Sequence, residues 1–367
     1  MTTNLTVLYF GVYEPSYARN WVLINGLRKN GVTVFECREN PKNRLKFFSL
    51  FFKYWKFVGK FDVMVVGFPG QEIMFLARLL AWGKPIIFDA FTSHYGGYIL
   101  DRKRWRQNSL RAWYYRFLDK WSCKLADVVL LDTNAHINFF VKEFNLPKKK
   151  FRRIWAGAND NIFQPFYVDQ GEPVQNHYAQ EKFNVLFFGT YIPLQGVEYI
   201  VRAAKILEQE KDILFTLVGN GQERSKTQEL SLKLGLKNVV FKDMMSLEKL
   251  KNEVADGDIS LGIFGRTQKA SIVIPNKVFM GLAMKKPVIT ADTEAIRELF
   301  NDEDMFLISP ANEQELAQVI LKIKNNPALG EKIAQNGYDK FIKFASHQIL
   351  GRELKNIIND QRSPLSG

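Results

Sequence analysis

The sequence predicts an α/β protein with two domains, each built on a parallel β-sheet. Three observations lead to this prediction. The chain has 367 residues, enough for two domains that each bury their own core. Short apolar runs recur at the spacing of strand–helix–strand units. One series precedes a polar segment at residues 169–181, and a second series follows it. That segment, DQGEPVQNHYAQE, breaks all periodicity and is therefore interpreted as a linker.

The first series of apolar runs predicts a helix over residues 21–29, ended by Asn30 and Gly31, and five strands. The strands are expected at residues 5–10, 32–37, 62–66, 85–88 and 127–131. Gly11, directly after the first strand, allows the backbone to approach a ligand or a helix closely. The sequence lacks the full Gly-x-Gly-x-x-Gly pattern there, so a dinucleotide site is only weakly indicated.

The second series predicts a second parallel sheet. Its strands are expected at residues 185–188, 213–218, 239–241, 259–263 and 287–290. The first runs into Gly189 and Thr190, and the second meets Gly219, Asn220 and Gly221. Two such domains in tandem leave a cleft between their strand ends. We therefore expect a first domain at residues 1–168, a linker at 169–182, a second domain at 183–345 and an amphipathic C-terminal segment at 346–367.

Residues 267–290 contain a turn, a helix and a strand in succession. The start of such a helix exposes unpaired N–H groups and the positive end of its dipole, which suits a phosphate. Pro275 stands where its missing donor costs nothing, and Lys277 adds a mobile positive charge just inside the helix. The alternative is an ordinary helix–strand connection that uses a proline to begin its helix.

Polar residues follow the strand at 85–88. Ligands of open α/β sheets lie beyond the carboxyl ends of the strands, so Asp89, Ser93 and His94 are expected to face a cleft. A single histidine in a loop is more often structural than catalytic, and that alternative stays open.

Composition and charge restrict the class of protein. An apolar content of 46% with 24% charged residues is typical of a globular chain. Cys37 and Cys123 are the only cysteines, which excludes a disulfide framework and fits a reducing compartment. Neither a secretory signal nor a bilayer-spanning run is expected, so the protein is predicted to be soluble or peripheral.

The positive charge is concentrated in the first half of the chain. Residues 1–170 contain 26 Lys and Arg against 13 Asp and Glu, a net charge of 26 − 13 = +13, whereas residues 171–367 contain 25 of each. Such asymmetry indicates an anionic partner: a membrane surface, a nucleic acid or a phosphorylated substrate. No nucleic-acid-binding motif accompanies the charge, so nucleic acid is not expected as a partner.

Residues 41–60 predict a basic amphipathic helix. Lys46, Lys53, Lys56 and Lys60 share one face with Lys42 and Ser49, and Trp55 lies among bulky apolar residues on the other. This pattern is typical of a helix in a membrane interface. The alternative is a helix packed on the sheet with a solvated lysine face. A second basic aromatic segment at 101–124 favours the membrane.

Taken in order, several segments resemble the retaining glycosyltransferases of family 4, which have the GT-B fold. The resemblance covers essentially the whole chain and is carried by an ordered series of motifs. These are VLFFGTYIPLQGVEYIVRAAKIL at 185–207, LVGNG at 217–221, ADGDISLGIF at 255–264 and, above all, PNKVFMGLA at 275–283 followed by KPV at 286–288. ADVVLLDT at 126–133 and GAND at 157–160 match the first domain.

The resemblance implies transfer of a sugar from a UDP- or GDP-sugar to an acceptor, with retention at the anomeric carbon and with no metal or other cofactor. The second domain would bind the donor, the basic first domain the acceptor, and the final helix would cross back onto the first domain. His94 matches a family histidine near the sugar, and Asp89 is placed beside it as a catalytic candidate. The expected donor site comprises Gly11, Gly189, Thr190, Gly219, Asn220, Gly221, Arg266, Lys269, Ser271, Asn276, Lys277 and Met280.

The chain departs from the family at several polar positions. The family's Glu-x7-Glu pair falls at Ile272 and Met280, and Met280 cannot accept hydrogen bonds from ribose hydroxyls as a carboxylate does. The usual Arg and Lys after the first strand of the donor domain correspond to Thr190 and Gln195. Asp256-Gly-Asp258 has the spacing of a metal-binding pair in another glycosyltransferase fold, but Asp256 is expected to end a helix and Asp258 to start a buried strand.

The sequence therefore predicts a peripheral, cytoplasm-facing glycosyltransferase on the inner face of a membrane, acting on a membrane-linked glycan or lipid. Arg266, Lys269 and Lys277 would supply the missing positive charge at the donor. Two alternatives remain: a non-catalytic GT-B partner at the membrane, which the missing polar residues favour, and a sugar-nucleotide epimerase, which the basic aromatic helix argues against because its substrate is soluble.

Overall fold

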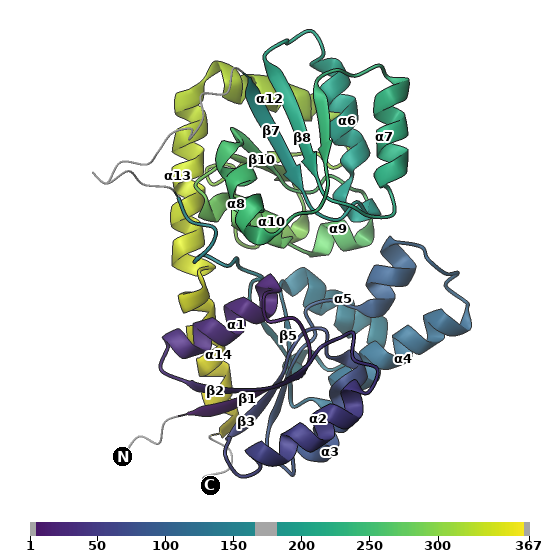
Figure 1. Ribbon diagram of the computed structural model, residues 1–367, viewed down its shortest axis with the longest axis vertical. Helices are drawn as coiled ribbons and strands as arrows, with labels where there is room; N and C mark the ends of the chain where they lie inside the picture. The colour runs from purple at the N-terminus through teal and green to yellow at the C-terminus, as the bar shows by residue number, and fades with distance from the viewer. Residues whose placement is uncertain (1–4, 166–181, 363–367) are drawn as a thin grey trace. The chain divides into compact units, whose positions relative to one another are not determined.

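A computed structural model describes residues 5–165 and 182–362 (Figure 1). The chain divides into two compact units. Unit 1 contains residues 1–157 and 345–367, and unit 2 contains residues 158–344. The division after Gly157 lies before the domain end expected at residue 168, and the expected linker at 169–182 lies outside the described residues except for Lys182.

Unit 1 is built on a six-stranded parallel sheet with the order β2-β1-β3-β4-β5-β6 (Figure 1). Its strands are β1 (Thr6–Val12), β2 (Thr33–Glu39), β3 (Val63–Val66), β4 (Ile86–Asp89), β5 (Val128–Leu131) and β6 (Phe151–Arg153). Strands β3, β4 and β5 are buried along their whole length, which explains their continuous apolar sequences. The carboxyl ends of all six strands lie at one edge, where loops carry the polar residues.

The helices of unit 1 include one from the far end of the chain. They are α1 (Ala18–Lys29), α2 (Lys46–Tyr54), α3 (Met74–Leu80), α4 (Leu110–Leu125), α5 (Asn134–Phe144) and α14 (His347–Arg362), with short helices η1 (Trp55–Phe57), η2 (Gln71–Ile73), η3 (Tyr95–Asp101) and η4 (Lys148–Lys150). Helix α14 packs against α1 where two glycines meet: a Cβ added to Gly351 would lie 2.0 Å from the carbonyl carbon of Gly26. The C-terminal segment thus belongs to the first unit.

Unit 2 contains a second six-stranded parallel sheet, with the order β12-β11-β10-β7-β8-β9. Its strands are β7 (Phe183–Phe188), β8 (Ile213–Val218), β9 (Val239–Lys242), β10 (Ile259–Leu261), β11 (Val288–Ala291) and β12 (Phe306–Ile308). Its helices are η5 (Pro193–Gln195), α6 (Val197–Ile206), α7 (Arg224–Lys233), α8 (Leu247–Asp256), α9 (Gln268–Ile272), α10 (Asn276–Ala283), α11 (Glu294–Arg297), α12 (Glu313–Asn325) and α13 (Pro327–Phe344). Buried side chains of the strands, α6 and α12 form one core cluster.

The predicted two-domain α/β fold is confirmed, with corrections to single elements. Strands β6 and β12 were not predicted; each has only three residues and lies at the edge of its sheet. The helix expected over residues 41–60 is shorter, because α2 and η1 together cover residues 46–57. Lys42 and Lys60 therefore lie outside it. No helix in the described part of the chain is long and apolar enough to span a bilayer.

Candidate functional site

In unit 2, the loops that follow β7 and β8 touch through glycine backbones. Gly189 and Gly219 have φ angles of +145° and +136°, which suit residues without a Cβ. A Cβ on Gly219 would lie 1.9 Å from the carbonyl oxygen of Gly189, so no other residue fits there. A Cβ on Gly221 would lie 2.5 Å from the carbonyl oxygen of Tyr191. The sequence-predicted glycines thus form one tight edge, and Thr190 and Asn220 are exposed on it.

Lys277 lies directly behind this edge. Helix α10 begins after its N-cap residue Pro275, as predicted, and Lys277 occupies its second position. The side chain is only 6% exposed. Its Nζ donates a hydrogen bond to Oε1 of Gln195 at 2.5 Å and lies 3.6 Å from the centroid of the Phe187 ring. A Cβ on Gly189 would approach this Nζ to 2.9 Å. The expectation of a mobile charge was wrong, because burial and these contacts hold the side chain.

The electrostatic setting of Lys277 is unusual for a lysine. It forms no ion pair with a carboxylate in the part of the chain that the structure describes, and burial lowers its pKa well below the ordinary value. The oxygen of Gln195 and the face of the Phe187 ring are its main favourable neighbours. An added anion would stabilise the charged form of this amine. Lys277 is thus a group beneath the Gly189 loop whose positive charge an anion would favour.

Gly11 lies within β1 of unit 1, and the remaining predicted donor residues lie on α9, α10 and the loop before them. Ala270 of α9 clusters with Ile192 and Leu194, which brings α9 beside the loop after β7. This short helix carries Lys269 and Ser271, and α10 carries Asn276 and the nearly buried Met280. Arg266 is exposed, and its guanidinium lies 3.5 and 3.4 Å from the carbonyl oxygens of Pro310 and Ala311. These residues share one region of unit 2.

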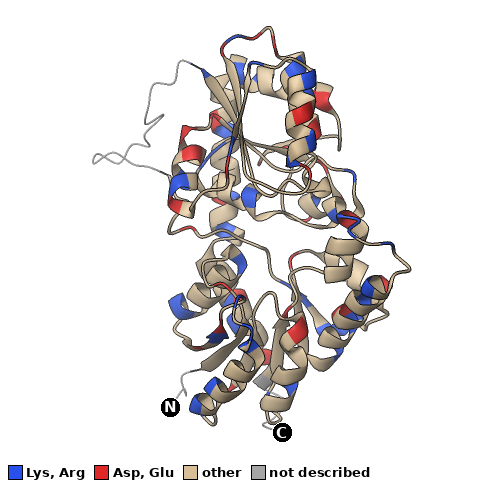
Figure 2. Ribbon diagram, turned by 45° about the vertical axis from the view of Figure 1, so that its right-hand side comes forward, with Lys and Arg blue, Asp and Glu red and all other residues tan. Residues whose placement is uncertain are grey.

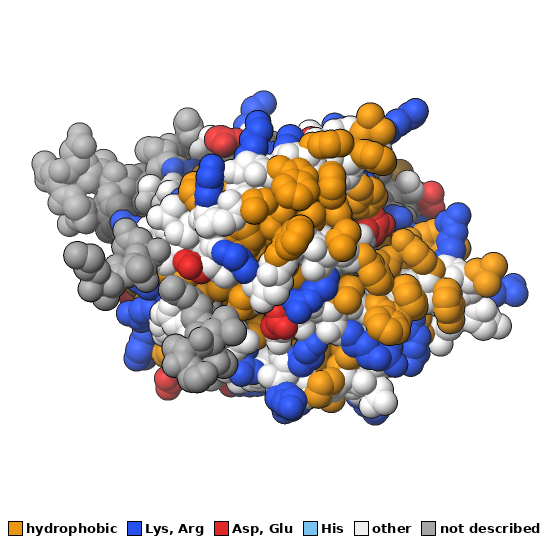
Figure 3. All heavy atoms as spheres, turned by 90° about the horizontal axis from the view of Figure 1, so that it is seen from below, with side chains coloured by type: hydrophobic (Ala, Val, Ile, Leu, Met, Phe, Trp, Pro, Cys, Tyr) orange, Lys and Arg blue, Asp and Glu red, His pale blue; other side chains and the backbone are white. Residues whose placement is uncertain are grey.

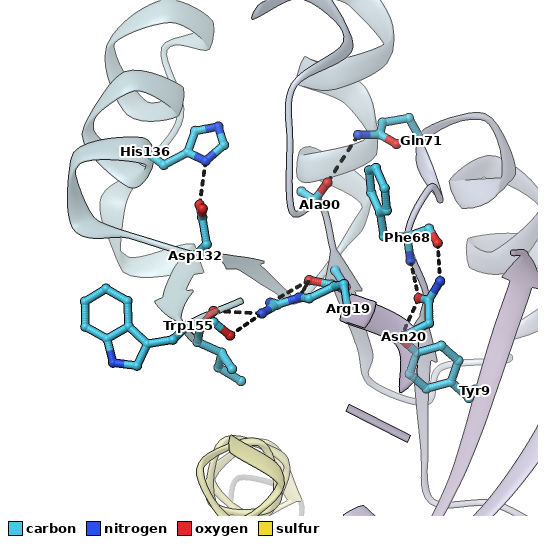
Figure 4. Close-up of polar contacts among 11 residues, drawn as sticks. Tyr9, Arg19, Asn20, Phe68, Gln71, Ala90, Asp132, His136 and Trp155 are labelled. Carbon is cyan, nitrogen blue, oxygen red and sulfur yellow. Dashed lines mark hydrogen bonds and ion pairs between the residues drawn. The ribbon is translucent and has the colours of Figure 1, made fainter. Parts of the chain in front are cut away.

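In unit 1, Asp89 is part of an internal ion pair. Both Asp89 and Arg19 are fully buried, and Arg19 Nη2 lies 2.8 Å from Asp89 Oδ1. Arg19 also donates to the carbonyl oxygens of Ile154 and Trp155 (Figure 4). Burial raises the pKa of Asp89, and the Arg19 guanidinium opposes that shift. The expectation that Asp89 faces a cleft as a catalytic group was wrong: it holds Arg19, which ties the loop after β6 to α1.

His94 is half-buried at the start of η3, a π-helical segment. The buried carboxylate of Asp119 in α4 accepts hydrogen bonds from Ser93 Oγ at 2.6 Å, the His94 backbone N–H at 3.1 Å and the Tyr95 N–H at 2.8 Å. Sequence reasoning missed Asp119. The signal was available, because Asp119 is the only acidic residue among residues 102–125, which otherwise carry eight Lys and Arg. A π-helix of this kind often marks a functional position.

Aromatic rings surround His94. The ring centroids of Tyr98 and Tyr115 lie 5.7 and 5.9 Å from that of the imidazole, and Trp105 lies 5.8 Å from Tyr115. Arg104 lies over Tyr98 at 5.4 Å, and Arg111 lies over Trp105 at 4.6 Å. Half-buried rings edged by guanidinium groups can stack on sugar rings and attract anionic substituents.

Two further buried polar groups of unit 1 were not predicted. His136 Nδ1 lies 2.7 Å from Asp132 Oδ1, at the junction of β5 and α5 (Figure 4). Asn20 accepts from the Tyr9 hydroxyl at 3.0 Å and from the Phe68 backbone N–H at 3.1 Å. Both residues fix loops at the carboxyl edge of the sheet. The partners of Asn20 are 11 and 48 residues away and left no local pattern, whereas Asp132 and His136 are four residues apart and could have been noticed.

The residues predicted to face a membrane behave differently from one another. Trp55 is half-exposed, and Lys46 Nζ lies 5.4 Å from the centroid of the Phe47 ring. Lys53 instead pairs with Glu39 at 2.7 Å and lowers the pKa of that carboxyl to about 2. Lys56 lies in η1 and Lys60 beyond it. Phe47, Phe48 and Phe52 of α2 are exposed, whereas Leu50 and Tyr54 are buried, so the apolar side of α2 is only partly packed on unit 1.

No group of three or more His, Cys, Asp and Glu residues suited to a metal occurs within residues 5–165 and 182–362. Asp256 ends α8, and the carboxylate of Asp258 accepts the backbone N–H of Asn184 at 2.7 Å, just before β10. This agrees with the structural role expected for both aspartates.

Comparisons with known proteins find similarity to glycosyltransferases. Residues 182–326 match the model of the family described as "Glycosyl transferases group 1". An alpha-D-kanosaminyltransferase of Streptomyces kanamyceticus is 22% identical over 225 residues, which cover 60% of this chain and 57% of that protein. The capsular polysaccharide biosynthesis glycosyltransferase CapM of Staphylococcus aureus is 22% identical over 59% of this chain and 57% of its own length. The chain thus spans somewhat more than half of these relatives.

Solved structures extend the similarity to the whole fold. Anabaena HepE, in complex with UDP and glucose, has a TM-score of 0.71 at 15% identity and covers 97% of this chain and 100% of its own. The sucrose-phosphate synthase of Thermosynechococcus elongatus has a TM-score of 0.72 at 15% identity, over 99% and 100% of the two chains. At such identities the likeness shows the shared fold alone.

Proposed function

We propose that this chain, whose residues 182–326 match the group 1 glycosyl transferases, moves a sugar from a nucleotide-sugar to a membrane-linked glycan or lipid. The transfer retains the anomeric configuration and needs no metal. One observation carries the proposal: Lys277 is a buried amine without a carboxylate, fixed behind the glycine loops at the start of α10. That is the place where the resemblance puts the donor phosphate.

A diphosphate would complete this site. It would stabilise the charged form of Lys277. It would also accept hydrogen bonds from N–H groups at the start of α10, where the helix dipole favours an anion. In the transfer, the bond between the anomeric carbon and the diphosphate oxygen breaks, and the leaving group keeps the electron pair. A fixed cation and aligned N–H groups stabilise that developing charge without a metal. Neighbours crystallised with UDP or UDP-glucose favour a UDP-sugar, with a GDP-sugar as the other option.

We assign the acceptor to unit 1. His94 would lie near the transferred sugar, and the rings around it would stack on saccharide. Arg104 and Arg111 at this cluster suit an acceptor that carries phosphate or carboxylate groups. Relatives named for capsular polysaccharide and lipopolysaccharide core synthesis support a glycan or glycolipid acceptor. We therefore propose that the protein acts at the cytoplasmic face of a membrane.

A second candidate is a non-catalytic partner with the same fold. Gln195 already satisfies Lys277, and Thr190 and Met280 replace groups that usually hold the donor. If these changes have closed the donor site, the chain would bind an active transferase or a membrane without turnover. Nucleotide binding separates the two candidates.

The test is calorimetric titration of the purified protein with UDP, GDP, ADP and their sugar nucleotides. One nucleotide should bind at micromolar strength. Lys277→Met should weaken that binding about 10- to 100-fold, because a charge-assisted hydrogen bond is worth about 1.5–3 kcal/mol.

Lys286→Met is the matched control. Lys286 is also largely buried, has a lowered pKa, and donates to a backbone carbonyl, that of Ala255 at 2.5 Å. It lies after α10 and away from the glycine loops, so its replacement should leave binding unchanged. Absence of binding across the panel, with a folded protein, would favour the non-catalytic partner. An equal loss of nucleotide affinity in Lys277→Met and Lys286→Met would contradict a specific role of Lys277 in donor binding.

A further inference from the structure

We infer that helices α2, α3 and α4 form one docking face by which unit 1 inserts hydrophobic side chains into an anionic lipid bilayer. This inference rests on the proposed function only for the membrane-linked acceptor; the face itself is argued from exposure and charge. It extends the two basic aromatic segments that the sequence assigned to a membrane, residues 41–60 and 101–124, to a surface of three helices.

The three helices expose an unusual number of large hydrophobic side chains. Twelve of them form what we call the hydrophobic face: Leu45, Phe48, Phe52, Trp55, Phe75, Leu79, Trp82, Leu110, Trp113, Tyr114, Phe117 and Trp121. Leu110 is 88% exposed and Trp82 is 73% exposed. An aromatic side chain presents roughly 150–250 Å², so half-exposure of twelve large side chains leaves about 1,000 Å². Monomeric soluble proteins rarely leave more than a few hundred Å² in one patch.

The hydrophobic face is continuous across the helices. The Tyr54 hydroxyl of α2 donates to the Leu80 carbonyl at the end of α3, which joins these two helices. Phe75 of α3 stacks on Phe117 of α4, with centroids 6.4 Å apart, and Phe117 in turn stacks on Trp113 at 5.6 Å. Figure 3 shows hydrophobic side chains gathered on the side of the molecule where α2 and α3 lie in Figure 1, with Lys and Arg around them.

The charge around the face selects an anionic surface. Residues 41–60 carry six Lys and Arg and no acidic residue, and residues 102–125 carry eight with only the buried Asp119 against them. Figure 2 marks the Lys and Arg positions in blue on the ribbon. Lys124 Nζ lies 4.6 Å from the centroid of Trp121, a cation–π contact that keeps a positive charge beside the hydrophobic face. Basic residues at the rim and aromatic residues at the centre are typical of membrane interfaces, whereas a protein partner would not require this one-sided charge.

Trp82 is held outward by an uncommon backbone conformation. It has a φ angle of +50°, and Gly83 follows with +80°. A left-handed conformation costs a bulky residue on the order of 1–2 kcal/mol, so the chain keeps a strained tryptophan in contact with water. Insertion of this ring into lipid would give that exposure a function.

The surface predicts how binding responds to salt. Lys53, which the sequence assigned to the membrane, is already paired with Glu39, so less charge is available than the lysine pattern indicated. Insertion of rings is insensitive to salt, whereas attraction to anionic lipid is screened. Salt should therefore weaken binding only in part, which differs from purely electrostatic docking.

The test is flotation of the full-length protein with vesicles of phosphatidylcholine that contain phosphatidylglycerol. The double variant Leu79→Ser/Trp82→Ser should bind at least tenfold more weakly. The matched control Ile206→Ser/Leu232→Ser removes two exposed hydrophobic side chains from unit 2 and should bind as the wild type does. Blue-shifted tryptophan fluorescence in the wild type, reduced in the first variant, would report insertion.

Other outcomes overturn the inference. Equal vesicle binding by all three proteins, or no binding by the wild type, would exclude this face as a membrane surface. If the wild type is a dimer in the absence of vesicles and Leu79→Ser/Trp82→Ser is a monomer, the face is a protein interface. Nucleotide titration of the same samples distinguishes a failure of the membrane inference from a failure of the proposed function. Leu79→Ser/Trp82→Ser should bind nucleotide as the wild type does, whatever the vesicle result.

Discussion

Each unit contains a buried cation near the start of a helix, and the partners of the two cations differ. Arg19 in unit 1 is fully buried against Asp89 and two carbonyl oxygens. Lys277 in unit 2 is nearly as buried, but among the described residues its Nζ contacts an amide oxygen and aromatic rings and forms no ion pair with a carboxylate. The first charge is neutralised within the fold, so it supports structure. The second is not, so it remains available to an anionic ligand.

The largest effect should come from breaking the compensated pair. Arg19→Met leaves Asp89 buried without its cation, and loss of one partner of a buried pair costs about 3–5 kcal/mol. Denaturant unfolding should show this loss. Arg78→Met is the control, because Arg78 pairs with Asp127 on the surface, and such pairs contribute less than about 1 kcal/mol. Equal, small losses in both variants would mean that the Arg19 pair adds nothing beyond a surface contact.

A smaller effect should follow from making unit 2 resemble unit 1. Gln195→Glu places a carboxylate where Nζ of Lys277 now finds an amide oxygen 2.5 Å away. The new carboxylate would neutralise the lysine and repel a diphosphate, so nucleotide affinity should fall about tenfold, equivalent to 1.4 kcal/mol. Gln195→Met, which removes the amide without adding charge, should change affinity less than about threefold. Calorimetry of both variants decides, and unchanged affinity in Gln195→Glu would contradict the role of an uncompensated charge.

The contrast also explains which features could be predicted from sequence. Strands β3, β4 and β5 are continuous apolar runs because they are buried on both faces, and the glycine loops after β7 and β8 follow from local turn chemistry. The state of a buried cation depends instead on a partner far along the chain. Arg19 and Asp89 are 70 residues apart, and Lys277 and Gln195 are 82 apart. No periodicity records such pairs.

The same limit applied to α2. Lysines recur every three or four residues through residues 42–60, and this predicted one long helix with its apolar side in a membrane interface, with packing on the sheet as the alternative. In the structure, two residues anchor α2 in the interior, Leu50 and Tyr54, and Lys53 turns toward Glu39. Which face of a short helix is buried depends on its neighbours, and here α3 and the end of β2 provide those neighbours. The pattern therefore predicted the amphipathic character of α2, but not its length or the two residues that anchor it.

The smallest effect is a pH dependence that only the uncompensated site should show. Burial lowers the pKa of Lys277, so above that lowered pKa a diphosphate must bind together with a proton from solution. Nucleotide affinity should then fall with rising pH, by at most tenfold per pH unit, and be constant below the lowered pKa. Measurements above pH 7 keep the terminal phosphate charged, since its second pKa is roughly 6. Calorimetry in buffers of different ionisation enthalpy should detect up to one proton taken up.

Fold stability should change in the opposite direction. Between the lowered native pKa of Lys277 and about 10.5 in the unfolded chain, the unfolded state binds more protons, so the free energy of unfolding should rise with pH. Lys277→Met should remove both the affinity slope and this contribution to the stability slope. Lys286→Met should keep the affinity slope, because Lys286 has no place at the phosphate. A nucleotide affinity independent of pH in the wild type would mean that Lys277 is already charged without its ligand. The contrast between a neutralised Arg19 and an uncompensated Lys277 would then fail.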